Sequence, residues 1–145
     1  MLVEAHLVAE ILGGAQVLGR TVNSILDLGE AVEQGLPKSS LRNSASHVRP
    51  DPAGQRQLIY QIVPEATYKR RRDRLSAAES ERTERLARVI AACHYVWSDV
   101  ADSRCFLESA HPALGGKTPL EASLSELGAR QVEELLEKIF HGLPV

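Results

Sequence analysis

A glycine-rich segment in the last third of the chain has side chains suited to phosphate binding, since residues 116–118 are Gly-Lys-Thr. A phosphate-binding loop also needs a glycine five residues before that triplet, and His111 stands there. Pro119 favours another interpretation, because proline suits the first turn of a helix and Thr118 can accept a backbone N–H as its N-cap. Glu121 completes a capping box. The segment therefore predicts a glycine turn that leads into a capped helix.

Two pairs of side chains could supply a nucleophile and a base for catalysis. They are Cys105 with His111, and Ser125 with His141. Neither nucleophile lies in the glycine-bounded turn that presents a catalytic serine. We therefore predict no catalytic residues and no enzyme activity.

A zinc site would have to combine the two cysteines, Cys93 and Cys105, with His94 and His111. Cys93 and His94 are adjacent, so their side chains would diverge by ~100° on a helix, and Cys-x-x-Cys spacing is absent. We predict no metal and no other cofactor. Both cysteines are interpreted as reduced thiols of a cytoplasmic protein.

A basic run follows a proline turn in the middle of the chain. Asp51 and Pro52 predict the start of a helix, which turns at residues 61–63, and Pro64 opens a second helix that reaches about Arg72. A helix, a tight turn and a short basic helix are typical of a helix-turn-helix, whose second helix enters the major groove of DNA. A solvated basic run at a domain junction is the alternative. The predicted DNA contacts are Thr67, Lys69, Arg70, Arg71 and Arg72.

Composition and periodicity predict an all-α protein of 145 residues. No apolar run approaches the ~20 residues of a membrane span, and acidic residues interrupt the apolar N-terminus, so we expect neither a membrane segment nor a secretory signal. The first half is predicted to contain helices over residues 3–12, from Asp27 as N-cap to Gln34, and from Pro37 onward. Residues 43–49 are polar and weakly patterned.

The second half has clearer helix signals. Ser76 and Glu79 form a capping box before an apolar stripe that runs from Leu86 to Trp97. Ser98 or Asp99 is expected to cap the next helix. The last helix is predicted to end at Gly142, and its apolar stripe comprises Val132, Leu135, Leu136, Ile139 and Leu143.

With these residues in place, residues 75–145 resemble the C-terminal toxin-binding region of the MbcA/ParS/Xre antitoxin family. The first half is similar, more loosely, to the Xre-like DNA-binding region of that family through residues 11–14, 35–37 and 63–64. Gln61, Ile62 and Phe106 depart from the family pattern. The residues that carry the C-terminal likeness are Leu75-Ser76, Glu79, Arg82, residues 85–88, Phe106-Leu107, His111-Pro112, residues 114–120, Gly128-Ala129, Val132-Glu133, Leu136, Ile139 and His141-Gly142.

The resemblance implies a helix-turn-helix-like region at residues 1–74 and a helical toxin-binding domain at residues 75–145. It implies an antitoxin of a type II toxin–antitoxin system that neutralises a RES-domain toxin, which consumes NAD. The same resemblance implies a homodimer that binds the operator DNA of its own operon. Two other functions stay open: a stand-alone helix-turn-helix regulator, and a protein adaptor that does not bind DNA.

The end of the last helix is the predicted toxin contact. We expect Leu143, Pro144 and the Val145 carboxylate to enter the mouth of the toxin's NAD site, where the carboxylate could replace a phosphate. A frayed terminus, a solvated Glu133 and a helix-capping His141 are the alternatives. The predicted toxin-binding residues are Arg130, Glu133, His141, Gly142, Leu143, Pro144 and Val145.

Overall fold

The computed structural model describes residues 3–145, and these residues form α-helices joined by short turns. The all-α prediction is confirmed. No helix within residues 3–145 has the length and apolar character needed to cross a lipid bilayer. The elements in chain order are α1 (Ala5–Ile11), α2 (Gly14–Leu18), α3 (Ile25–Gln34), α4 (Lys38–Ser46), α5 (Pro52–Ile62), α6 (Glu65–Arg70), α7 (Ala77–Trp97), α8 (Val100–Leu107), the 3-10 turn η1 (Pro112–Leu114), α9 (Pro119–Ala122) and α10 (Glu126–Phe140).

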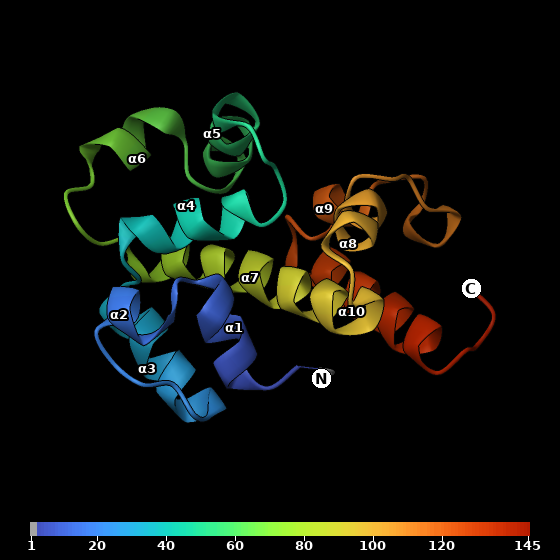
Figure 1. The fold of residues 1–145 in the computed structure, drawn as a ribbon. Helices are drawn as coiled ribbons and strands as arrows, with labels where there is room; N and C mark the ends of the chain where they lie inside the picture. Colours follow the sequence, from blue (N-terminus) through green and yellow to red (C-terminus); the bar gives the residue numbers. More distant parts are fainter. Residues whose placement is uncertain (1–2) are drawn as a thin grey trace.

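Helix α7 is the centre of the molecule, and helices from both halves of the chain pack against it. Figure 1 shows α4, α5 and α6 on one side of α7, α1 to α3 on another, and α10 along its C-terminal half. Leu86, Val89, Ile90 and Cys93 on α7 are buried, as the apolar stripe predicts. Because one core continues across α7, the division at residues 74 and 75 stays a prediction.

Four of the predicted helix starts form with their capping hydrogen bonds. One is α8, where the Asp99 carboxylate accepts the Asp102 N–H at 3.1 Å. Ser76 and Glu79 make a reciprocal capping box at α7, and Thr118 and Glu121 make another at α9. The Asp51 carboxylate accepts the Gly54 N–H at 2.7 Å, with Pro52 as the first residue of α5. Each cap satisfies a backbone donor that the first helical turn leaves without a partner.

One predicted cap was wrong, and two helical segments were not predicted. The N-cap of α3 is Ser24, whose hydroxyl accepts the Asp27 N–H at 3.1 Å, so Asp27 lies inside the first turn. Helix α2 was not predicted. Most of residues 43–49 belong to α4 or to its C-cap, and the segment is helical because Ser44 and Ala45 are buried against the core.

An ion pair fixes the link between α6 and α7. The Arg71 guanidinium donates to both carboxylate oxygens of Glu79, through Nε at 2.9 Å and Nη2 at 3.0 Å. The same carboxylate accepts the Ser76 N–H at 2.8 Å. The Arg71 side chain and this backbone bond lower the pKa of Glu79 to about 2, and Glu79 is only 5% exposed.

Glu79→Gln is therefore expected to lower the free energy of unfolding by about 2 kcal/mol near neutral pH, because it leaves the Arg71 charge without its partner. The Glu79 pKa is depressed in the folded state, so its contribution is present above the ordinary carboxyl pKa and is lost as pH falls toward about 2. Urea unfolding of both proteins across this range measures the difference. A gap between wild type and variant that stayed constant down to the lowest pH would contradict the assignment.

Candidate functional site

The predicted helix-turn-helix is formed by α5 and α6. Helix α5 runs to Ile62, so the turn is shorter than predicted and consists of Val63 and Pro64 in extended conformations. Arg82 on α7 donates through Nε to the Ile62 carbonyl at 2.9 Å and holds the end of α5. Helix α6 ends at Arg70, so Arg71 and Arg72 follow it.

The five predicted DNA-contacting residues differ in how free they are. Thr67 is half-buried, and Lys69 donates to Glu65 at 2.7 Å, which raises the pKa of Lys69. Arg71 is held by Glu79. Arg70 and Arg72 are exposed and have no ion pair or side-chain hydrogen bond within the described chain. The structure therefore leaves two cations of the basic run available to a ligand without breaking an internal contact.

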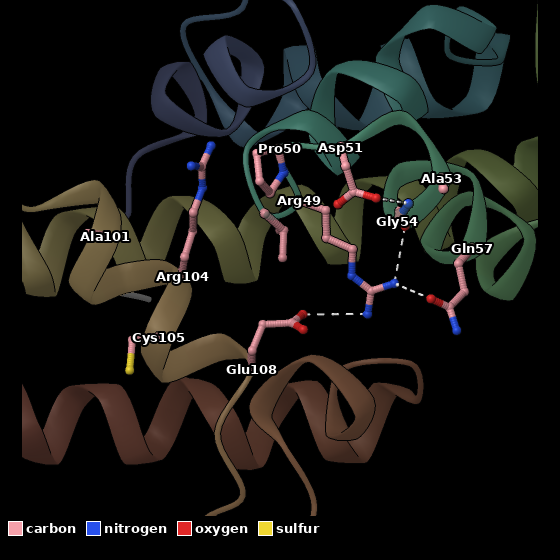
Figure 2. A pocket seen from close by; sticks show the side chains of 11 residues that line it. Arg49, Pro50, Asp51, Ala53, Gly54, Gln57, Ala101, Arg104, Cys105 and Glu108 are labelled. Carbon is pink, nitrogen blue, oxygen red and sulfur yellow. Dashed lines mark hydrogen bonds and ion pairs between the residues drawn. The ribbon is translucent and has the colours of Figure 1, made fainter.

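A cleft of about 700 Å³ separates the N-terminal half of α5 from α8. Figure 2 shows that Arg49 crosses it, donating to the Gly54 carbonyl at 3.1 Å, to Gln57 at 3.3 Å and to Glu108 at 3.5 Å. On α8, Arg104 donates to the His47 carbonyl at 3.1 Å, at the C-terminal end of α4. Both arginines are thus engaged in joining α8 to the helix-turn-helix region, and we interpret the cleft as a structural junction.

The last helix ends in a motif that fixes the direction of the following residues. Gly142 has a left-handed φ of 67°, and its N–H donates to the Ile139 carbonyl at 3.1 Å. The Leu143 N–H donates to the Lys138 carbonyl at 2.8 Å. This pair of bonds is a Schellman motif, with His141 as the C-cap. Leu143, Pro144 and Val145 therefore leave α10 in a defined direction, and all three are exposed.

Two aromatic residues that sequence reasoning missed lie beside this end of the chain. Tyr95 on α7 and Phe140 on α10 have ring centroids 5.3 Å apart, and Phe140 lies 5.2 Å from the His141 ring. Phe140 lies outside the predicted apolar stripe of α10, and a large apolar residue at such a position could have indicated an exposed contact surface. We call the exposed group Tyr95, Phe140, His141, Leu143 and Val145 the C-terminal tip. Its four large apolar side chains are each 46–61% exposed.

The two other predicted toxin-binding residues lie nearer the N-terminal half of α10. Glu133 accepts from Arg88 Nε at 2.6 Å, so this ion pair joins α10 to α7 and Glu133 is not simply solvated. Arg130 is exposed. Neither residue belongs to the C-terminal tip.

The alternative catalytic pairs are not assembled. Ser125 is the N-cap of α10 and His141 is its C-cap, so a helix more than ~20 Å long separates them. The His111 Nδ1 accepts the Ala113 N–H at 3.0 Å, while the Cys105 sulfur lies near Ser109.

The cysteine that was considered as a zinc ligand is part of the core. Cys93 is buried, and burial raises the pKa of its thiol. Within residues 3–145 no three His, Cys, Asp or Glu side chains are grouped to hold a metal ion. Thr118, from the glycine-rich segment, acts as a helix cap.

Two family models match the chain. Residues 27–88 match the antitoxin Xre-like helix-turn-helix domain, and residues 93–142 match the antitoxin Xre/MbcA/ParS C-terminal toxin-binding domain. The first match ends within α7 and the second begins within it. A curated relative, the antitoxin Xre of Pseudomonas putida, is 32% identical over 85 residues, which are 57% of this chain and 54% of the relative. The match thus spans about half the length of that relative.

The two matched regions together cover more than three quarters of the sequence, in the order that the resemblance implies. The first contains α5, α6 and the basic run, and the second contains α8 to α10 with the base of the C-terminal tip. The chain belongs to the Xre/MbcA/ParS antitoxin family, with a helix-turn-helix domain followed by a toxin-binding domain.

Proposed function

We propose that this protein is the cytoplasmic antitoxin of a type II toxin–antitoxin system, and that it neutralises a RES-domain toxin that consumes NAD. The observation that supports this most is the separation of two exposed surfaces on one continuous core. Figure 1 shows α6 and the C-terminal end of the chain at opposite ends of the molecule. The two surfaces therefore do not overlap on one protomer.

The C-terminal tip contacts the toxin in this proposal. Its apolar side chains are exposed in the free protein, and covering them is favourable by about 25 cal/mol per Å². Leu143 to Val145 occupy the mouth of the NAD site, while Phe140 and Tyr95 pack against its rim. Arg130 contributes at the edge, and Glu133 supports α10 through Arg88. The NAD chemistry belongs to the toxin, and this chain performs none.

At the other end of the molecule, α6 binds the operator of the same operon. Arg70 and Arg72 contact DNA phosphates with guanidinium groups that have no internal partner within residues 3–145. Lys69 can replace its ion pair with Glu65 by one with a phosphate, and Thr67 lies beside the face of α6 that meets the bases. Arg71 stays on Glu79 and positions the helix. Two protomers bind as a homodimer, because one short recognition helix gains affinity and register from a second half-site.

Arg70→Gln and Arg72→Gln are each expected to weaken DNA binding at low salt, and each lost phosphate contact lowers the steepness of the salt dependence by about one ion. Fluorescence anisotropy with a labelled duplex from upstream of the gene, titrated at several salt concentrations, measures both effects. Lys138→Gln on α10 is the control for loss of one positive charge. Equal affinities and slopes for all three variants would exclude α6 as the DNA contact.

Co-expression with the product of the adjacent gene tests the protein-binding half. A tag on this chain should recover that product as a complex that survives gel filtration. Phe140→Ser is expected to reduce recovery, since it removes the aromatic centre of the C-terminal tip. Leu127→Ser, at a more exposed position near the start of α10, should leave recovery unchanged. No recovery with the wild-type chain would contradict the proposed partner.

A further inference from the structure

A second basic feature lies on the same side of α7 as α6, between α4, α5 and α6. It is a pocket of about 290 Å³ whose lining includes Arg42 from α4, Arg56 and Tyr60 from α5, and Tyr68 from α6. None of the described residues that line it carries a carboxylate. The sequence prediction of DNA contacts included no residue of this pocket.

Tyr68 lines this pocket, and its hydroxyl is in an unusual state. Tyr68 is only 8% exposed, and its buried hydroxyl has no hydrogen-bond partner within residues 3–145. A buried tyrosine usually finds a partner for this group, because leaving it unpaired costs the desolvation of a strong donor. Packing alone would be served equally well by phenylalanine. The hydroxyl is therefore expected to bond to a ligand that is bound beside it.

The charges around the pocket indicate what that ligand is. Arg42 and Arg56 are exposed, and neither has an ion pair or a side-chain hydrogen bond within the described chain. The Lys38 ammonium, which donates to the Arg71 carbonyl at 3.1 Å, lies 4.4 Å from the centroid of the Tyr68 ring and adds positive charge near it. Guanidinium groups suit the oxygens of a phosphate, which can accept from two arginines and a phenol together.

We propose that Arg42, Arg56 and Tyr68 form a phosphate pocket, and that its ligand is a phosphate of the DNA backbone. The inference rests on the proposed DNA-binding function. Helix α5 is the first helix of the helix-turn-helix, and in this class of domain the first helix crosses the backbone while the second enters the groove. Contacts of this kind set the register of the protein on the duplex and carry no sequence information. The pocket thus anchors α6, and Arg70 and Arg72 act beside it.

The test compares DNA binding by full-length variants. Tyr68→Phe removes one oxygen that has no internal partner, so it should leave the melting temperature unchanged or raise it while it weakens DNA binding roughly fivefold. Arg42→Gln and Arg56→Gln should each weaken binding and lower the salt slope by about one ion. The losses should be equal for the upstream duplex and for a scrambled duplex of the same length. Tyr95→Phe and Arg130→Gln are the matched controls for loss of a hydroxyl and of a charge.

A second arm separates the two sources of a phosphate group. Inorganic phosphate is titrated into the wild-type chain while the ring signals of Tyr68 are followed by NMR, and the Arg42→Gln/Arg56→Gln double variant is the reference. Saturable shifts that the double variant abolishes support the phosphate pocket. If the chain shows these shifts but binds no DNA, the ligand of the pocket is free phosphate and the proposed DNA-binding function is wrong. If the pocket variants bind DNA as tightly as the controls, and the wild-type chain shows no response to phosphate, the pocket proposal is wrong. The proposed DNA-binding function is not affected by that result.

Discussion

Deletion of Leu143, Pro144 and Val145 is expected to restore NAD consumption to a toxin–antitoxin complex that remains assembled. The three residues are exposed, and none of their side chains has a hydrogen bond within the described residues. Their removal therefore costs only the bond from the Leu143 N–H to the Lys138 carbonyl at the end of α10, and the rest of the fold should be kept. Burial of a leucine side chain is worth about 2 kcal/mol, which corresponds to roughly a 30-fold change in occupancy of the pocket that it fills. Turnover should rise by at least about tenfold over the intact complex. The assay measures NAD loss by the purified complex, with gel filtration to show that it is still assembled.

Two substitutions give this deletion its controls. Leu143→Ser should reproduce most of the effect, because Leu143 is held at the end of α10 by the Schellman motif and is the first residue to enter the proposed site. Leu127→Ser removes a leucine that is 69% exposed near the start of α10, and it should leave inhibition intact. Unchanged inhibition after the deletion would reject blockage by the tail. Dissociation of the complex would show that residues 143–145 contribute to the affinity for the toxin and do not act by blocking its NAD site.

Gly128→Ala is expected to destabilise the toxin-binding domain strongly, although it adds only one methyl group. A Cβ at Gly128 would collide with the Ala122 carbonyl oxygen and lie 2.8 Å from the Ser125 hydroxyl, which is the N-cap of α10. The obstructing atoms are backbone and a cap, so neither can move without displacing the start of α10 from α9. We expect a loss of about 3 kcal/mol, or about 10 °C in melting temperature. Calorimetry of the full chain measures it.

Gly29→Ala is the matched control, because it also adds one methyl group inside a helix. Nothing lies within 4 Å of a Cβ at Gly29. Alanine also favours the helical conformation there, so this variant should be more stable than the wild type by about 0.5–1 kcal/mol. Equal effects of the two substitutions would show that α10 does not approach Ala122 as closely as the structure has it.

Much of the fold could be predicted from local signals. The capping boxes at Ser76 and Thr118 and the Asp51-Pro52 start are short motifs whose hydrogen bonds lie within one turn, so the sequence contains all of the information. The C-terminal half of α4 was missed for a different reason. Its inward face includes the buried Ser40 and Ser44, which appear polar in sequence, and the Ser44 hydroxyl is satisfied by the Ser40 carbonyl at 2.8 Å.

The site was less predictable, because its geometry depends on contacts between distant segments. The sequence of the basic run did not indicate that Arg71 pairs with Glu79 while Arg70 and Arg72 have no internal partner in the described chain, because all three residues carry the same charge. Glu133 pairs with Arg88, which lies 45 residues away in the chain. Tyr95 and Phe140 meet only once α10 packs on α7. The phosphate pocket draws on three helices, so no single segment contains its pattern.

Titration of the purified RES-domain toxin with this chain, followed by the rate of NAD loss, is the decisive assay for the proposed neutralisation. If the C-terminal tip closes the NAD site in a tight complex, the rate should fall linearly with added chain and reach zero at a fixed molar ratio. Full NAD turnover in the presence of an excess of folded chain would contradict neutralisation.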